Sequence, residues 1–266
     1  MLLGPALLAG AVALLAWWLS TGAILLAVRR ADRAGGRAHV ALTLATLPAM
    51  LGGVAGFVWT QGGTGPGAVY GAFFAALAIW GWIELAFLTG VITGPNPHPA
   101  RAGVPEWERF VRAWGTVAYH EMTLTAALIG LILLNHGQPN RFGLWTFAIL
   151  YAARVSAKLN LYLGVRKVNT EFIPRPLAHL PSHFRSARIN WLFPTSVTVL
   201  TFAAACWLER LAAATSPTEA VGFALLAALT ALALLEHWLL IVPLPDEKLW
   251  RWMLPKTKPE ETDAVR

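Results

Sequence analysis

The chain has 266 residues, of which 56% are hydrophobic and 13% are charged, and its mean hydropathy is +0.55. A soluble domain usually has about a quarter of its residues charged. The composition therefore excludes a soluble protein and predicts an integral membrane protein. The one cysteine, Cys206, excludes a disulfide framework or a cysteine metal site. The sequence contains no phosphate-binding loop, no hydrolase motif and no nucleic-acid-binding motif.

Apolar windows of about 20 residues, the length that crosses a bilayer, recur along the chain. They predict an all-α, polytopic transmembrane bundle of about seven helices, with 1–266 as one transmembrane domain. The predicted spans are approximately 2–28, 40–60, 68–92, 113–135, 143–165, 191–212 and 219–242. Residues 243–266 would form a tail, in which 243–255 has the mixed composition of a short surface-lying amphipathic segment.

Basic residues gather in alternate connections, which predicts the orientation of the bundle. Seventeen of the 21 lysines and arginines fall within the connections 29–37, 101–112 and 166–188 and in the tail 243–266. By the positive-inside rule, that side of the membrane is cytoplasmic. We therefore expect the N-terminus outside and the C-terminus in the cytoplasm.

Ionisable side chains inside the predicted spans are the most informative residues, because each costs about 2.5 kcal/mol or more in hydrocarbon unless it is paired or solvated. These residues are Glu84, His120, Glu121, Arg154, Lys158, Glu236 and His237. They come from four spans, in each case from the cytoplasmic half. Tyr151, Arg154, Lys158 and Tyr162 also share one helical face, which we expect to look inward.

Three interpretations of this group stay open at the level of the sequence. In the first, the two cations neutralise two of the carboxylates in a buried ion-pair network. In the second, histidines act as axial ligands of a tetrapyrrole, or histidines and carboxylates bind non-haem iron or manganese. In the third, the group serves the passage of a proton or a small solute.

The second interpretation assigns a role to each residue. The candidate metal ligands are Glu84, His120, Glu121, Glu236 and His237. The candidate cofactor-binding residues are His120 and His237 as axial ligands, with Arg154 and Lys158 as counter-ions or anchors for an acidic substituent. The two cations argue against a dense metal cage, because they would compete with the ion for the same carboxylates.

The long connection 166–190 is the other informative segment. Its three prolines, Pro174, Pro176 and Pro181, exclude a continuous helix. His179, His183 and Glu171 are weaker metal-ligand candidates, which could reach the intramembrane group from the cytoplasmic side. We prefer the ordinary interpretation of these histidines as interfacial residues, in a loop whose arginines bind lipid phosphate or a propionate.

Four stretches carry a family resemblance: WIELAFLTG at 82–90, AYHEMTL at 118–124, LNLYLGVRKVNTEFIPRPLAHLPSHFRSARIN at 159–190 and LLEHWLLIVPLPDEKLWRWML at 234–254. With them the chain resembles the seven-span PuhE-type photosynthetic complex assembly proteins of purple and related phototrophic bacteria. The resemblance implies a multi-pass protein of the bacterial inner, photosynthetic membrane that assists reaction-centre assembly and modulates bacteriochlorophyll production or delivery. It implies no catalytic residues.

From the resemblance and the residues together, we expect a factor without catalytic turnover. Its implied partners are the lipid bilayer, reaction-centre subunits and bacteriochlorophyll biosynthesis enzymes, and not nucleic acid. Its implied ligand is bacteriochlorophyll or a precursor. The alternative is an intramembrane two-iron oxidoreductase acting on a lipophilic or tetrapyrrole substrate. A small-solute transporter is a second alternative, which the lack of a visible repeat disfavours.

Overall fold

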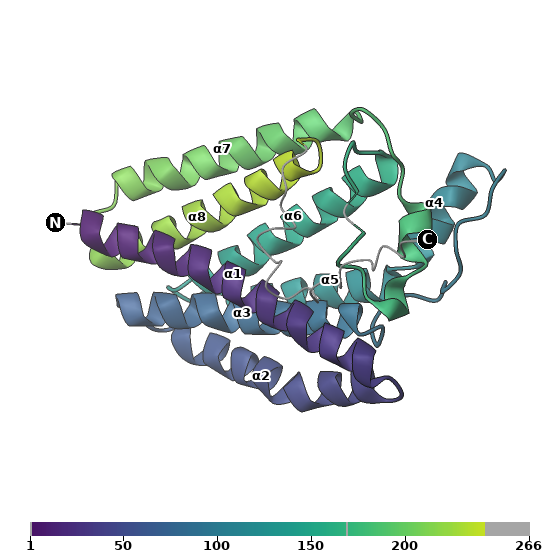
Figure 1. Cartoon of the computed structure of the whole chain (residues 1–266). Coiled ribbons are helices and arrows are strands. Elements are labelled where there is room, and N and C mark those ends of the chain that lie inside the picture. The colour runs from purple at the N-terminus through teal and green to yellow at the C-terminus, as the bar shows by residue number, and fades with distance from the viewer. Residues whose placement is uncertain (1, 169, 243–266) are drawn as a thin grey trace, which may run out of the picture.

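The computed structural model describes residues 2–168 and 170–242, and this part of the chain is helical apart from its connections (Figure 1). The elements in chain order are α1 (Leu3–Ala34), α2 (Ala38–Thr60), α3 (Pro66–Leu88), α4 (Glu106–Gly115), α5 (Ala118–Leu134), α6 (Phe142–Leu163), the 3-10 turns η1 (Arg175–Leu177) and η2 (Leu180–His183), α7 (Leu192–Ala212) and α8 (Pro217–Leu239). The predicted tail 243–266 lies outside the described residues.

The prediction of an all-α membrane bundle is confirmed, and each predicted span overlaps one long helix. Five of these helices, α1, α2, α3, α7 and α8, are long and apolar enough to cross a membrane, and the bent pair α4–α5 gives a sixth candidate. The predicted span 143–165 forms α6, which is not among the candidates. Its polar residues, including Arg154, Lys158 and Asn160, lower its hydropathy. The structure thus supports five to six spans instead of about seven, and the orientation stays a prediction.

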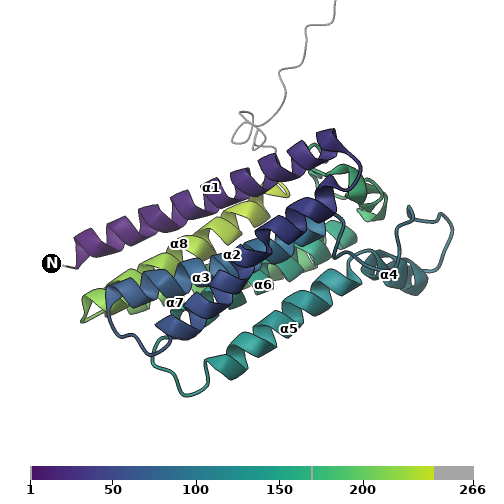
Figure 2. The same ribbon diagram turned by 90° about the horizontal axis from the view of Figure 1, so that it is seen from below.

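Helices α3 and α8 form the centre of the bundle, and the other helices pack around them (Figures 1 and 2). In α8 and α3, 61% and 50% of the apolar window is buried, against 17% in α1, α2 and α7. Ala9 and Ala13 of α1 are fully buried against Phe73 of α3 and Leu225 of α8. Small residues such as these alanines let helix backbones approach closely where lipid supplies no hydrophobic driving force.

The fourth predicted span, 113–135, is divided in the structure. Helices α4 and α5 meet at 67° around residues 116–117, so the straight helix begins at Ala118. The preceding loop supports this bend, since Asn96 donates from its backbone to the Gly115 carbonyl and from its side chain to the Arg112 carbonyl. A hydropathy window averages across such a break, which is why the expected span began too early.

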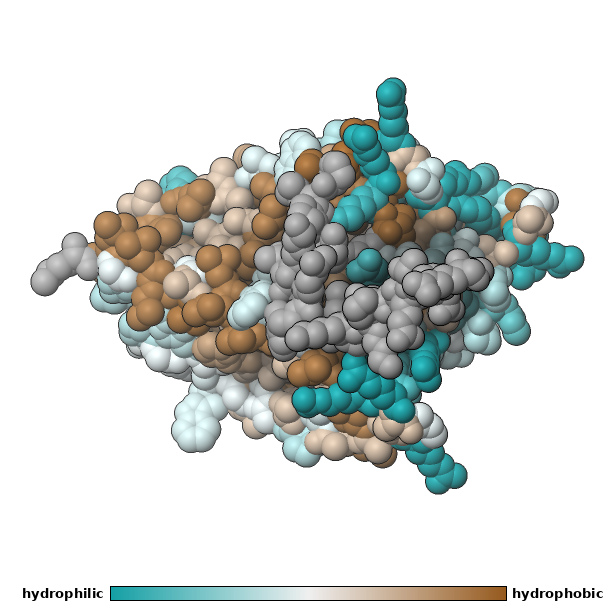
Figure 3. Space-filling view, viewed as in Figure 1, coloured by the Kyte–Doolittle hydropathy of each residue, from teal (hydrophilic) through white to brown (hydrophobic). Residues whose placement is uncertain are grey.

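Helix α4 is amphipathic and lies at the hydrophilic end of the molecule. Its large apolar residues follow helical spacing and are exposed: Trp107, Phe110, Val111 and Trp114. In Figure 3, hydrophobic side chains cover much of the bundle, whereas hydrophilic ones gather toward the end that carries α4 and the loop after α6. This distribution is typical of a protein whose charged end lies outside the hydrocarbon region.

The connection after α6 folds into an ordered cover at that same end (Figure 1). As its prolines predicted, the helical structure in its described residues is limited to the short turns η1 and η2, with Pro181 in the first turn of η2. Buried Asn190 donates to the Gly164 carbonyl across 2.8 Å, which closes the base of the loop. Arg185 reaches Glu106 of α4 across 2.6 Å, so the loop and α4 are joined.

Candidate functional site

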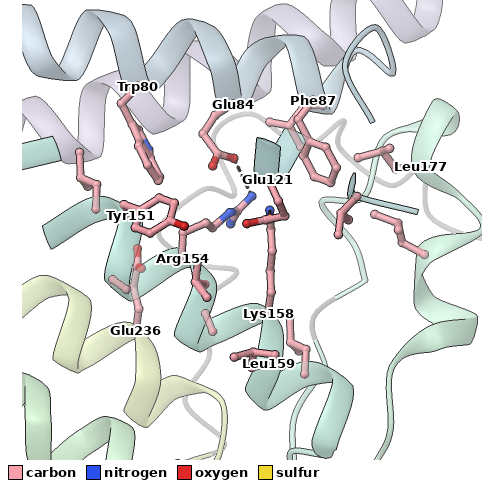
Figure 4. Close-up of a pocket in the computed structure, with 18 of the residues that line it drawn as sticks. Trp80, Glu84, Phe87, Glu121, Tyr151, Arg154, Lys158, Leu159, Leu177 and Glu236 are labelled. Atoms are coloured by element: carbon pink, nitrogen blue, oxygen red, sulfur yellow. Dashed lines mark hydrogen bonds and ion pairs between the residues drawn. The ribbon is translucent and has the colours of Figure 1, made fainter. Parts of the chain in front are cut away.

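A cavity of about 980 Å³ lies among α1, α3, α5, α6 and α8 and is also lined by α4 and the loop after α6. Its walls are mostly apolar, as Trp80, Phe87, Leu159 and Leu177 illustrate in Figure 4. A volume of this size is at the upper end for small-molecule sites. The polar side chains on its wall include Glu84, Glu121, Tyr151, Arg154, Lys158 and Glu236.

The first ion pair in the cavity joins α6 to α3. Nη2 of Arg154 donates to Oε2 of Glu84 across 2.6 Å. The other carboxylate oxygen of Glu84 is buried without a hydrogen-bond partner and lies 3.6 Å from Nε2 of His120. Arg154 keeps a buried, unpartnered Nε. One carboxylate thus lies between a guanidinium and an imidazole.

The second ion pair joins α6 to α5. Nζ of Lys158 donates to Oε1 of Glu121 and, across 2.8 Å, to Nδ1 of His120. An ammonium group has donors only, so Nδ1 is the acceptor and the imidazole proton lies on Nε2, toward Glu84. The ring of Phe87 packs on His120 with centroids 4.4 Å apart and lies 4.9 Å from Nζ of Lys158. A cation over an aromatic face is electrostatically favourable.

The inward face predicted for α6 is present. Tyr151, Arg154, Lys158 and Tyr162 all line the cavity, and the hydroxyl of Tyr151 is hydrogen-bonded to Thr125 of α5 across 3.0 Å. The structure therefore brings the predicted residues of α3, α5 and α6 together as two linked ion pairs. Of the interpretations left open by the sequence, the arrangement fits the ion-pair network most directly.

Glu236 lies on the α8 wall of the same cavity, across from Tyr151 and Arg154 (Figure 4). Its side chain is exposed to the cavity, and Trp17 of α1 is its hydrogen-bond partner. Unlike Glu84 and Glu121, it forms no ion pair with any cation among the described residues. Glu236 therefore presents a carboxylate that no described cation contacts, although the charge of Arg154 acts on it from a distance.

His237 follows Glu236 in sequence but belongs to a different cluster. Its Nδ1 lies 2.8 Å from the carbonyl of Ala233 and its Nε2 lies 2.9 Å from the hydroxyl of Ser156. Ser156 in turn contacts Ser196 of α7, which accepts from Asn160 across 3.0 Å. Both ring nitrogens of His237 are thus engaged between α6, α7 and α8, and the structure does not bring His237 to His120.

The polar cluster around His237 was not anticipated from the sequence. Its members Ser156, Asn160 and Ser196 are uncharged and scattered through apolar helices. The available signal was their position, since Ser156 and Asn160 are four residues apart on α6, on a face that differs from the cavity face. The cluster holds α7 against α6 through hydrogen bonds in place of apolar contacts alone.

The predicted metal site is only partly assembled. Within residues 2–168 and 170–242, no group of three or more His, Cys, Asp and Glu side chains is arranged to hold a metal ion. Arg154 and Lys158 form ion pairs with the carboxylates of Glu84 and Glu121. The sequence had indicated that these two cations would compete with a metal ion for the carboxylates. The assignment of a metal to these residues stays a prediction.

The weaker loop candidates lie in the cover over the cavity. His183 lines the cavity, and its Nε2 donates to the His98 carbonyl across 3.0 Å. His179 has a buried Nε2 without a hydrogen-bond partner, and burial, followed by the nearby His183 and His98, lowers the pKa of its imidazole. The backbone carbonyl of Glu171 accepts from Arg29 of α1 across 3.0 Å, which ties the loop to that helix.

Comparison with known proteins places this architecture in a family. The chain is 52% identical over 249 residues to the "uncharacterized 30.4 kDa protein in puhA 5'region" of Rhodobacter capsulatus, an alignment that covers 93% of this chain and 91% of the relative. No solved structure matches the chain. The chain belongs to the family described as protein of unknown function DUF3623, whose model matches residues 4–261.

Proposed function

We propose that this protein is a membrane-embedded assembly factor for the photosynthetic reaction centre, which modulates bacteriochlorophyll production or delivery without catalytic turnover. In this role it holds the pigment or a precursor in the cavity between α1, α3, α5, α6 and α8. The observation that carries the proposal is the cavity itself, about 980 Å³ in volume, apolar on most of its wall and lined by a small set of charged side chains.

The cavity suits a large, flat, lipophilic molecule with few polar substituents. Ligand sites are usually lined by apolar and aromatic side chains, with a few polar groups that fix the orientation of the ligand. Here Trp80, Phe87 and Leu159 supply apolar surface, and Arg154 and Lys158 supply cations that an acidic substituent of a tetrapyrrole could approach. The cavity is part of a bundle that spans the bilayer, where a lipophilic pigment is soluble.

The photosynthetic setting rests on two further observations. The stretches 82–90, 118–124, 159–190 and 234–254 resemble the PuhE-type assembly proteins, and three of them carry Glu84, Glu121 and Glu236. The name of the Rhodobacter capsulatus relative refers to the puhA 5' region. Both observations support a role in the photosynthetic membrane, with reaction-centre subunits or bacteriochlorophyll biosynthesis enzymes as partners.

Deletion of the gene in a phototrophic host, followed by complementation, tests the proposal. We expect deletion to lower both the reaction-centre absorbance and the total bacteriochlorophyll per cell. The variant Ala126→Trp places an indole in the cavity from the exposed side of α5 and should fail to complement. Ala205→Trp, an exposed residue of α7 away from the cavity, is the matched control and should complement. Unchanged reaction-centre and pigment levels in the deletion strain would overturn the proposal.

A further inference from the structure

We propose that Glu236 holds the polar centre of the bound ligand, and that this centre is the metal of a lipophilic chelate. The inference rests on the proposed function, because it assumes that the cavity receives a ligand. The distinguishing observation is that Glu236 alone among the charged residues on the described cavity wall lacks an ion-pair partner.

The charges around the cavity indicate an electropositive ligand group. Arg154 with Glu84 and Lys158 with Glu121 form two complete ion pairs, in which the charges balance. Glu236 adds one acidic group that no cation in the described part of the bundle contacts, since Arg154 acts on it only from a distance and is paired with Glu84. A carboxylate in a largely apolar environment is costly unless a cation or a metal approaches it. The ligand that best fits this wall therefore brings a positive centre to Glu236.

The ring nitrogens of His120 and His237 and the free oxygen of Glu84 are held within the bundle. Both ring nitrogens of His237 are hydrogen-bonded within the bundle, and Nδ1 of His120 accepts from Lys158. Nε2 of His120 and Oε1 of Glu84 are buried against each other. Neither histidine lines the cavity, whereas Glu236 does. Among the axial and carboxylate ligands predicted from the sequence, Glu236 thus has the ligand atoms most accessible from the cavity.

The position of Glu236 in its helix argues that it does not serve helix stability. It lies in the last turn of α8, which ends at Leu239. The C-terminal end of a helix carries a partial negative charge, so an acidic side chain there is unfavourable. Trp17 approaches it from α1 as a hydrogen-bond donor, which fixes the carboxylate without neutralising it. A carboxylate that is oriented and has no contacting cation among the described residues suits a ligand-binding role.

The chemistry of the carboxylate selects the kind of metal centre. Magnesium is a hard cation that prefers oxygen ligands, and a metal bound in the plane of a macrocycle has an open axial position. One carboxylate oxygen can fill that position, so no cluster of three protein ligands is needed. Apolar side chains on the cavity wall, such as Trp80 and Phe87, would receive the macrocycle.

The test compares two probes that differ only in the metal. Zinc pheophorbide methyl ester and metal-free pheophorbide methyl ester both lack a free acid, so neither can bind through an ion pair with Arg154. Each is titrated by absorption and fluorescence into full-length protein in lipid nanodiscs. We expect the wild type to bind the zinc probe about tenfold or more tightly than the metal-free probe, with the absorption shift of axial ligation.

The variant Glu236→Gln keeps the shape of the side chain and removes its charge. It should bind the zinc probe no better than the metal-free probe, and its affinity for the metal-free probe should be unchanged. Glu209→Gln, an exposed glutamate of α7, is the matched control and should behave as the wild type. Glu236→Asp keeps a carboxylate, so a partial return of the preference for zinc is expected. Thermal unfolding by circular dichroism confirms that each variant is folded.

The possible failures can be told apart. If both probes bind equally to the wild type, or if Glu236→Gln keeps the preference for zinc, the role of Glu236 is overturned while the cavity remains a pigment site. If neither probe binds the wild type, the inference fails together with the pigment-holding part of the proposed function. Unchanged pigment levels in the deletion strain would instead reject the proposed role in the cell, and the affinities measured for the two probes would still stand.

Discussion

The ammonium group of Lys158 donates to Nδ1 of His120 across 2.8 Å and to the carboxylate of Glu121, and so connects α6 to two consecutive residues of α5. This contact sets the tautomer of His120, because only Nε2 is left to carry the ring proton. That proton faces Glu84, which Arg154 holds from the other side. One lysine therefore orders a line of polar side chains across α3, α5 and α6.

Replacing Lys158 by methionine tests this relationship. Lys158→Met keeps the apolar stem but leaves the mostly buried carboxylate of Glu121 and Nδ1 of His120 without a donor. Loss of one partner of a buried ion pair typically costs about 3–5 kcal/mol. We expect the free energy of unfolding to fall by about that amount, as measured by denaturation of the purified protein in mixed micelles.

The double variant Lys158→Met/Glu121→Gln is the control for this prediction. Because it removes both charges, it should recover part of the lost stability. If the effects of Lys158→Met and Glu121→Gln simply add, the ion pair is energetically idle and the structural role assigned to Lys158 is wrong.

The positions of the long helices and the pairing of the buried cations with carboxylates could be predicted from the sequence. Apolar windows locate the long helices, and buried charges must be paired, which predicted that Arg154 and Lys158 would neutralise carboxylates. The choice of Glu84 and Glu121 over Glu236 was not predictable. Periodicity defines the faces of one helix, but it does not say which way that helix is turned relative to its neighbours.

The dipeptide Glu236-His237 shows the same limit within one helix. Adjacent residues of an α-helix point about 100° apart, so they often contact different neighbours. In the structure Glu236 faces the cavity and His237 faces Ser156. Helical geometry predicts that the two side chains point in different directions. Only the packing against α6 and α7 decides which of the two residues faces the cavity.

Helix α4 makes a separate prediction about depth in the membrane. Its exposed aromatic residues and its 67° bend from α5 are typical of a helix that lies in the interface plane. In a Cys206→Ala background, a spin label at Trp107→Cys should report a shallow depth by power-saturation electron paramagnetic resonance. A label at Ile129→Cys, an exposed residue about three turns into α5, should report a deeper position. Equal depths would contradict an interfacial α4.

The junction between α4 and α5 depends on a close approach at Gly94. A Cβ atom at this position would lie 2.1 Å from the carbonyl oxygen of Gly115 and 2.7 Å from the carbonyl carbon of Thr116. Both are backbone atoms, so rotation of a side chain cannot relieve the contact. Forced repacking of this kind costs about 1–3 kcal/mol.

We therefore expect Gly94→Ala to lower the free energy of unfolding by about that amount and to change the depth of a label on α4. Gly62→Ala is the comparison, because the added methyl group in another connection would meet no atom within 4 Å. If the two alanine variants unfold alike, the bend does not depend on the contact at Gly94.

The loop over the cavity should weaken as the pH falls, because of His179. Burial, and then the charges of His183 and His98, lower the pKa of His179 below its ordinary value of 6.5. The unfolded chain therefore binds a proton more readily than the folded chain, so the free energy of unfolding falls as the pH drops through about 6.5. We expect the wild type to lose stability between about pH 8 and pH 5.5 relative to His179→Gln, which cannot titrate there. Denaturation of both proteins at the two pH values gives the difference. A difference that does not change with pH, or that favours the wild type at acid pH, would show that the imidazole is not desolvated in the folded loop.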